Sequence, residues 1–355
     1  MKPCSTSQLA WIFAGCFLGA GFVSGQELWQ FFGCFGRWAL PALLLSILLM
    51  AGLGIVLLRL AQYTGITELD SIVIRRKIPW LRNLTAILQI VFLFGIVTIM
   101  IAGAGALIAQ LTGLPSWLGS LGMTVLVAVV AMFGLQGIVR VFSTLVPIIV
   151  AATLLIGVVA LRHFGIDAFH FSTEGSTNPL LPNWFVAALT YAAYNFFGTI
   201  GILTPFGTII SSKKTVISGI LLGGLVLLVI ACSILAALCV NHAAIGEELP
   251  MLALSCTISM PLGYIYGLLL LFGLFGTTCS CLVAVVTFLD LRVPRFAAHK
   301  TAGIGILSLL GFAASLAGFG NLVSTVYPMF GYASIFFLAG IITHFFHVKR
   351  ELPRQ

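Results

Sequence analysis

The chain has 355 residues, of which 60% are hydrophobic and only 7% are charged. Soluble globular domains carry about 25% charged residues, so this composition excludes an ordinary soluble protein and indicates a membrane protein with several spans. The net charge of +8 comes from basic residues dispersed over loops, and these do not form the single basic groove of a nucleic-acid-binding protein.

Ten apolar stretches are long enough to cross a bilayer, which requires about 20 helical residues. They cover residues 9–35, 39–60, 84–112, 118–137, 141–161, 183–211, 215–240, 261–289, 301–319 and 322–346. We do not expect the first to be a signal peptide, because it is long, contains Glu27 and leads directly into the next stretch. The sequence therefore predicts an all-α polytopic membrane protein with ten transmembrane helices.

Lysine and arginine are distributed unevenly between the two sides of these stretches. Fifteen fall on one side, whereas only Arg37 and Arg162 fall on the other. Because Lys and Arg accumulate in cytoplasmic loops, this bias predicts an even number of spans and two cytoplasmic chain ends. The expected location is the inner, cytoplasmic membrane.

The spans divide into two groups of five. We expect residues 1–162 to form one repeat and residues 183–346 to form another, with an extracytoplasmic connector at 163–182 and a cytoplasmic tail at 347–355. Since five is odd, two similar repeats would enter the membrane from opposite sides, which makes them an inverted repeat within one transport domain. Glycines inside spans, such as Gly105 and Gly223, are expected to permit close helix packing.

The first span is interrupted by Gly19-Ala20-Gly21-Phe22-Val23-Ser24-Gly25-Gln26-Glu27. Irregular backbone at membrane depth is tolerated only where protein or a water-filled cavity receives the freed polar groups. Ser24 to Glu27 has the S-x-x-E form of a capping box, which predicts a half-helix from Ser24 preceded by an unwound segment. Free N–H groups at such a helix start attract anions, a substrate carboxylate included.

Glu27 is the one acidic residue well inside a predicted span. Intramembrane carboxylates are costly and by default functional, so it can carry a coupling proton or meet a cationic substrate group. The alternative is a structural capping residue favoured by the helix dipole. The sequence leaves both interpretations open.

The sixth span contains a second polar segment, in which Asn195, Gly198 and Thr199 interrupt the apolar pattern. Thr204-Pro205 then supplies a cap residue and a proline at a first helical position, so we expect a second half-helix to begin there. Tyr194 and Phe196 would line the cavity, or else pack against lipid and neighbouring helices. Two interruptions in corresponding positions of two halves indicate a transporter site.

The eighth span carries Thr277 and Thr278 among Leu and Phe residues. Hydroxyls in a span can bond the backbone or neighbouring helices. They can otherwise coordinate a hard cation together with carbonyls freed by the first interruption. No Cys or His cluster has metal-ligand spacing, so we expect no cofactor beyond a coupling ion, Na⁺ or H⁺.

The segment from Gly19 to Glu27, followed by Phe31-Phe32, resembles the opening of the YkvI-type amino acid permeases of bacteria, in the amino acid-polyamine-organocation superfamily. The resemblance implies a LeuT-like five-plus-five inverted repeat with broken helices 1 and 6. It implies a substrate site lined by Gly19 to Gly21 and by Phe196 to Gly198. It further implies a sodium site built from the carbonyls of Gly15 and Leu18 and the hydroxyls of Thr277 and Thr278. With their neighbours in both interruptions, the expected substrate-binding residues are Gly19, Ala20, Gly21, Phe22, Ser24, Glu27, Tyr194, Asn195, Phe196, Gly198 and Thr199.

The chain departs from well-characterised members at Gly198-Thr199, where many permeases have glycine followed by an acidic residue. The fifth span lacks the lysine that replaces sodium in some proton-coupled relatives, which favours sodium here. The leading hypothesis is a secondary transporter of an amino acid or similar small zwitterion. A channel or receptor is the alternative, and an intramembrane enzyme is weaker because no catalytic constellation accompanies Glu27.

Overall fold

The computed structural model describes residues 5–66, 79–133, 146–171, 178–210 and 212–351, and in these ranges the chain forms helices and no strand. The elements are α1 (Thr6–Phe17), α2 (Ala20–Val23), α3 (Gln26–Phe31), η1 (Gly33–Trp38), α4 (Ala39–Thr64), α6 (Pro79–Thr112), α7 (Ser116–Met132), α9 (Val146–Phe164), η2 (Ile166–Ala168), α10 (Trp184–Ile209), α11 (Lys213–Cys239), η3 (His242–Gly246), α12 (Pro250–Ile258), α13 (Met260–Arg292), α14 (Pro294–Ala298), α15 (Lys300–Ser315) and α16 (Phe319–Glu351).

Seven helices in the described part of the chain are long and apolar enough to cross a membrane. They overlap the predicted spans at 39–60, 84–112, 141–161, 183–211, 215–240, 261–289 and 322–346. Two shorter apolar helices, α7 and α15, overlap the spans predicted at 118–137 and 301–319. Residues 134–137, 141–145 and 211 of the predicted spans lie outside the described ranges. The chain is thus an all-helical membrane protein, and the count of ten spans stays a prediction.

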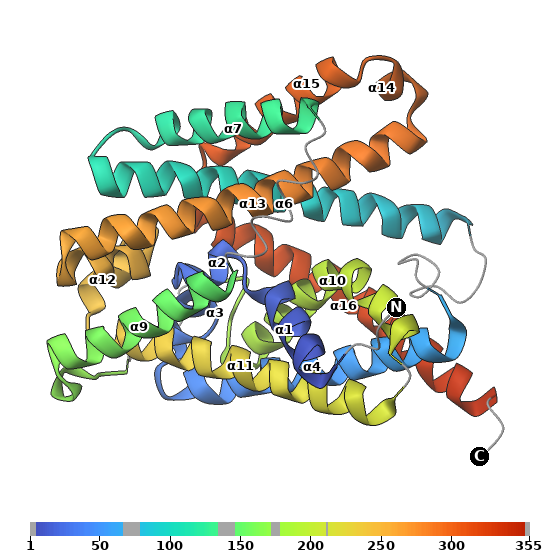
Figure 1. Cartoon of the computed structure of the whole chain (residues 1–355), viewed down its shortest axis with the longest axis horizontal. Helices are drawn as coiled ribbons and strands as arrows, with labels where there is room; N and C mark the ends of the chain where they lie inside the picture. Colours follow the sequence, from blue (N-terminus) through green and yellow to red (C-terminus); the bar gives the residue numbers. More distant parts are fainter. Residues whose placement is uncertain (1–4, 67–78, 134–145, 172–177, 211, 352–355) are drawn as a thin grey trace.

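The helices form two layers that run alongside each other (Figure 1). One layer contains α6, α7, α13 and α15, which pack on one another, and the other contains α1, α4, α10 and α11. Two further helices join them: α9 packs against α11 and α13, while α16 packs against α10, α4 and α6. The short helix α12 lies at one end of the long helices, at the left of Figure 1, and α16 ends at the other.

Close packing between helices depends on glycine at several crossings. A Cβ atom on Gly223 of α11 would lie 2.7 Å from the carbonyl oxygen of Ala10 in α1, and one on Gly105 of α6 would lie 2.6 Å from that of Ser116 in α7. Neither distance can hold a methyl group, so the two backbones approach closely only because no side chain separates them. The packing role expected for these two glycines is confirmed.

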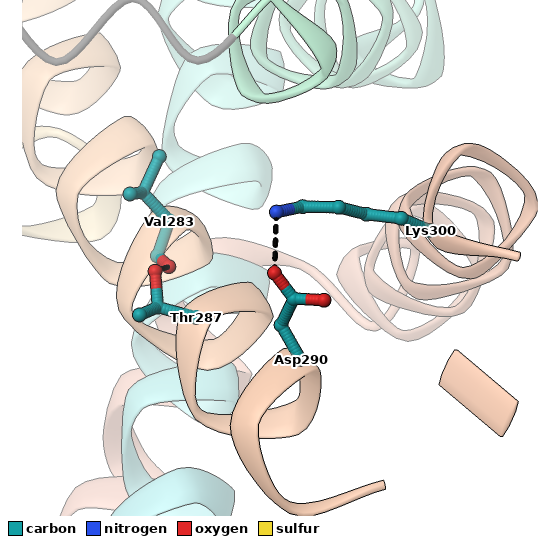
Figure 2. Close-up of polar contacts among 4 residues, drawn as sticks. All are labelled: Val283, Thr287, Asp290 and Lys300. Carbon is teal, nitrogen blue, oxygen red and sulfur yellow. Dashed lines mark hydrogen bonds and ion pairs between the residues drawn. The ribbon is translucent and has the colours of Figure 1, made fainter. Parts of the chain in front are cut away.

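An ion pair joins two helices at the end opposite α12. Lys300 at the start of α15 lies 2.6 Å from the Asp290 carboxylate near the end of α13 (Figure 2). The neighbouring hydroxyl of Thr287 donates to the carbonyl of Val283, within α13. Both charged side chains are partly exposed, and such pairs contribute at most about 1 kcal/mol, so this contact closes the turn around α14 without determining the fold.

We predict that Gly223→Ala destabilises the protein by about 1–3 kcal/mol, because the new methyl group must push α1 away from α11. The matched control is Gly122→Ala on α7, where a Cβ atom meets nothing within 4 Å. Melting temperatures in detergent should fall for Gly223→Ala and stay the same or rise for Gly122→Ala. Equal melting temperatures would show that the α1–α11 contact is loose.

Candidate functional site

The helical path through the first predicted span is interrupted twice. Helix α1 ends at Phe17, and Leu18 and Gly19 leave helical geometry before the single turn of α2. A second interruption follows at Gly25, whose φ of +84° is in the left-handed region that glycine adopts without strain. The predicted unwound segment at 19–23 is therefore mostly a one-turn helix, with irregular backbone on either side of it.

The predicted capping box is wrong. Gly25, not Ser24, is the residue that precedes α3, and it makes no side-chain cap. The Ser24 hydroxyl donates to the carbonyl of Gly21 at 2.8 Å and accepts from the N–H of Gln26 at 3.4 Å. The left-handed turn at Gly25 separates Ser24 from the geometry that a capping box needs, and this leaves the Glu27 carboxylate free to bond elsewhere.

Carbonyl groups freed at the second interruption are bonded by other helices. The hydroxyl of Tyr266 in α13 donates to Val23 at 2.7 Å, and the N–H of Met251 in α12 donates to Ser24 at 2.9 Å. Tyr266 is itself held by the hydroxyl of Thr153 in α9, 3.1 Å away. Because an unpaired buried carbonyl costs as much as a lost hydrogen bond, these partners stabilise the irregular backbone at this depth.

Carbonyl groups at the first interruption have fewer partners. The N–H of Leu18 bonds Ala14, and the N–H of Gly19 bonds Phe17, so the carbonyls of Gly15 and Leu18 accept no backbone hydrogen bond within the described ranges. A Cβ atom on Gly15 or Gly19 would meet nothing within 4 Å. The end of α1 thus has carbonyl oxygens without a backbone donor, and open space adjoins the Cα atoms of Gly15 and Gly19.

Glu27 is buried at the centre of a cluster from three helices. Its carboxylate accepts a short hydrogen bond from the hydroxyl of Tyr194 in α10. Asn195 and Tyr191 also lie beside this carboxylate. The Asn195 amide, however, donates to the carbonyl of Tyr191 at 3.2 Å, within α10, and the buried Tyr191 hydroxyl has no partner in good hydrogen-bonding geometry. Tyr327 of α16 stacks on the ring of Tyr194, with centroids 4.6 Å apart and an interplanar angle of 15°.

Gly21 of α2 forms the opposite wall of this cluster. A Cβ atom there would lie 2.8 Å from Oε2 of Glu27, 3.6 Å from the hydroxyl of Tyr327 and 3.9 Å from Cε of Met100 in α6. Among the described residues, Glu27 makes no ion pair with Lys, Arg or His. Helix α2, between the two interruptions, therefore faces a carboxylate that has a hydrogen-bond donor but no positively charged partner among the described residues.

The predicted interruption of the sixth span is wrong. Helix α10 is continuous from Trp184 to Ile209 and begins after Asn183, whose side chain accepts from the N–H of Val186. The hydroxyl of Thr204 donates back to Ile200 at 2.6 Å instead of capping a new helix, and Pro205 lies inside the helix. Helix propensity is a weak prior that burial overrides, and the polar groups of this segment are satisfied within α10.

Of the predicted substrate-binding residues, only Gly21, Tyr194 and Asn195 lie next to Glu27. Ser24 supports α2 from within, while Ala20, Phe22 and Phe196 are buried. Gly198 faces α6, where a Cβ atom would lie 2.9 Å from the Phe92 ring. The hydroxyl of Thr199 donates to its own helix at 2.9 Å, and Gly19 borders open space.

Sequence reasoning missed Tyr191, Tyr327 and Met100. Tyr191 precedes Tyr194 by one helical turn, which places the two on one face of a helix and was a usable signal. Nothing in the sequence indicates that Tyr327 and Met100 lie near Glu27, because both are far from it along the chain and belong to other predicted spans.

The expected sodium ligands on the eighth span are partly occupied. Thr278 is fully buried, and its hydroxyl donates to the carbonyl of Leu274 at 2.6 Å, which is the backbone-bonded alternative raised above. Helix α13 approaches the first interruption at Gly273, where a Cβ atom would lie 3.7 Å from that of Ala20. Thr277 follows one turn later on the same face. No described contact joins either threonine to Gly15 or Leu18.

The α12 end of the cluster is closed by polar contacts. Gln30 of α3 donates to the carbonyl of Gly320 at 3.2 Å, and Gln110 of α6 donates to that of Leu249 at 3.3 Å. The Glu248 carboxylate accepts from the N–H groups of Phe319 and Gly320 at the start of α16. Burial raises the pKa of Glu248 more than these N–H groups lower it. The segment 242–258 thus joins α6 to α16, and Gln30 joins α3 to α16 at the same end.

The fold is that of secondary transporters in the membrane. The structure matches the inward-facing conformation of Mhp1 with a TM-score of 0.69 at 16% identity, covering 99% of this chain and 78% of that one. It matches MhsT in complex with L-phenylalanine with a TM-score of 0.58 at 15% identity, covering 99% of both chains. A manganese transporter of Eremococcus coleocola gives a TM-score of 0.58 at 14% identity, covering 94% and 78%. These neighbours are transporters and not enzymes, and the expected LeuT-like fold agrees with them.

The sequence itself is similar to two bacterial proteins along nearly its whole length. It is 26% identical over 343 residues to the uncharacterized membrane protein YkvI of Bacillus subtilis (strain 168), covering 95% of each chain. It is 25% identical over 333 residues to the uncharacterized protein YyaD of the same organism, covering 93% of this chain and 94% of that one. No family model matches. The predicted resemblance to YkvI is confirmed.

We predict that Gly21→Ala impairs ligand binding, because its methyl group would displace the Glu27 carboxylate from the position facing α2. Gly19→Ala is the matched control, since it lies two residues away and its Cβ atom meets nothing. In a thermal-shift titration with a stabilising ligand, Gly21→Ala should bind at least about tenfold more weakly, which corresponds to 1.4 kcal/mol. Similar affinity in both variants would remove Gly21 from the site.

Proposed function

We propose that the protein is a secondary active transporter of an amino acid or similar small zwitterion, coupled to a cation and working by alternating access. The observation that carries this proposal is the buried Glu27 carboxylate, which faces the interrupted first helix without a cationic partner in the described structure. The fold, shared with known transporters, supports the assignment to secondary transporters. The buried carboxylate and its surroundings support a substrate that carries an ammonium group.

An ionised carboxylate at this depth needs a positive charge nearby. The hydrogen bond from Tyr194 orients the carboxylate but brings no charge. A proton or the ammonium group of a ligand can supply it. The rings of Tyr194 and Tyr327 beside the carboxylate add aromatic surface that also attracts cations.

The other end of a zwitterion has a complementary partner next to Glu27. The N–H groups of Ala20, Gly21 and Phe22 make no backbone hydrogen bond in the described ranges. A ligand carboxylate can accept from these groups while its ammonium group meets Glu27. Amine and carboxylate would then be recognised from opposite sides of Gly21, within the span of a single amino acid.

Sodium is the coupling ion that we favour over the proton. The free carbonyls of Gly15 and Leu18 are hard oxygen donors of the kind that alkali cations take in interrupted helices. Thr277 and Thr278 would complete the site if α1 moves toward α13. The hydroxyl oxygen of Thr278 keeps acceptor capacity while it donates to Leu274.

The helix contacts support the proposed inverted repeat. Let α1–α3, α4, α6, α7 and α9 correspond in order to α10, α11, α13, α15 and α16. Helix α1 then packs on α11 as α10 packs on α4, and α9 packs on α11 as α16 packs on α4. Likewise α7 packs on α13 as α15 packs on α6. Such matched contacts support ten spans, two five-helix repeats and a rocking motion of one layer against the other.

The test of the substrate is a thermal-shift screen of the purified protein against the twenty amino acids, in sodium and in potassium buffers. Binding at a hundred times the dissociation constant should stabilise the protein by about 2.7 kcal/mol. For each hit, the analogues lacking the amine or the carboxylate should both bind weakly. An amino acid that binds in sodium buffer but not in potassium buffer would support sodium coupling. If none of the amino acids binds in either buffer, the proposed substrate class is overturned.

We predict that Glu27→Gln abolishes ligand-induced stabilisation and uptake into proteoliposomes while leaving the unliganded melting temperature nearly unchanged. The amide keeps the size and can still accept from Tyr194, but it lacks the charge that an ammonium group requires. Glu247→Gln, on an exposed loop residue, is the control and should transport normally. Normal uptake by Glu27→Gln would leave this carboxylate with a structural role only.

For orientation, we propose two cytoplasmic chain ends in the inner membrane, as the distribution of Lys and Arg indicates. Reporters fused after Gln355 and within the loop at 62–83 should be cytoplasmic. A reporter in the connector at 163–182 should be on the outer side. A C-terminal reporter on the outer side would contradict the ten-span arrangement.

A further inference from the structure

A polar cavity lies far from Glu27, at the end of the molecule opposite α12. Its volume is about 380 Å³, and it lies between the end of α4 and the end of α10. It is lined by Arg59, Ala61, Gln62, Tyr63, Gly65, Gly207, Thr208 and Ile210. None of these residues belongs to the Glu27 cluster or to the proposed substrate and ion sites.

Arg59 is the charged group of this cavity, and its guanidinium is held in place from several sides. It donates to Oε1 of Gln62 at 2.8 Å and to the hydroxyl of Tyr63, and it lies 4.5 Å above the centroid of the Tyr63 ring. Gln62 in turn donates to the carbonyl of Ile210 at the end of α10. The guanidinium group is therefore positioned between two helices, and hydrogen bonds to the protein fix its orientation.

Within the described residues the positive charge of Arg59 has no acidic partner. None of the residues that line the cavity is acidic, and Arg59 makes no ion pair with any residue that the structure describes. A guanidinium has five N–H donors, so the contacts to Gln62 and Tyr63 leave others for a ligand. Lys213 and Lys214 follow Ile210 closely along the chain and are exposed, which raises the positive potential at this end.

An arginine near a helix end can simply extend its charge to the membrane surface. Such a side chain needs neither a cavity nor an aromatic ring and an amide to fix its head group. A guanidinium that is fixed in a cavity and makes no ion pair with the described residues instead has the geometry that arginine uses to bind phosphate. Basic pockets between membrane helices at the cytoplasmic side are positions where anionic head groups bind.

We propose that this cavity binds a phosphate group, that of an anionic phospholipid, with Arg59 as its anchor. The bound phosphate bridges α4 and α10, because Arg59 belongs to the first helix and the Gln62 amide bonds the end of the second. This site is independent of the proposed transport substrate.

The experiment measures melting temperature and lipid binding of the delipidated protein in a neutral detergent. Phosphatidylglycerol, phosphatidylcholine, glycerol 3-phosphate and inorganic phosphate are titrated separately. Phosphatidylglycerol should stabilise the wild type in a saturable manner, and phosphatidylcholine should not. If inorganic phosphate or glycerol 3-phosphate saturates the effect at lower concentration than the lipid, the phosphate comes from a soluble molecule and the lipid assignment is overturned.

Three variants identify the site. Arg59→Gln should weaken phosphatidylglycerol binding by about tenfold or more, since charge-assisted hydrogen bonds are lost. Arg292→Gln is the matched control, because Arg292 also bonds an amide side chain, Asn83, and lies 5.1 Å over an aromatic ring, Phe288, yet does not line the cavity. Thr208→Phe keeps the charge but fills the cavity, so it should weaken binding even if Arg59→Gln fails to fold. Equal lipid affinity in Thr208→Phe and Arg292→Gln would overturn the proposal.

Discussion

The structure depends on how a membrane protein satisfies the backbone groups of an irregular segment that water cannot reach. The segment between α1 and α3 meets this constraint with donors from elsewhere: Tyr266 bonds Val23, and Met251 bonds Ser24. These two donors belong to α13 and α12, so the interruption fixes the positions of both elements. The cluster around Glu27 and the closed α12 end are consequences of this arrangement.

The apolar pattern of the sequence predicted the helices well, because stretches such as 39–60 and 215–240 contain few polar residues and coincide with α4 and α11. The interruption near Gly19 to Gly25 was also visible, since three glycines and a serine stand within an otherwise apolar span. What failed was the sixth span. Gly198 and Pro205 end helices in water, but inside a packed apolar layer the helix offers the best available hydrogen bonds, and α10 continues through both.

The candidate site shows the same division between local and distant information. Glu27 stands out in the sequence as an isolated carboxylate, and Tyr194 lies in a polar segment. The decisive contact is the hydrogen bond from Tyr194 to Glu27, which joins residues 167 positions apart. The capping box failed for a local reason, because a left-handed residue at Gly25 changes the direction of the chain and no sequence motif reports that turn.

Leu18 and Gly19 join two parts of the chain that are anchored differently. On one side, α2 and α3 are tied to α12, α13 and α16 by the bonds at Val23, Ser24 and Gln30. On the other side, α1 packs mainly on α11, and open space adjoins Gly15 in its last turn and Gly19 just beyond its end. The backbone torsions of Leu18 and Gly19 therefore set the position of α1, together with α11, relative to the wall that faces Glu27. If α2 binds the ligand and the end of α1 binds the ion, the two sites are connected by the backbone of Leu18 and Gly19. The binding of one would then depend on the backbone conformation that the other favours.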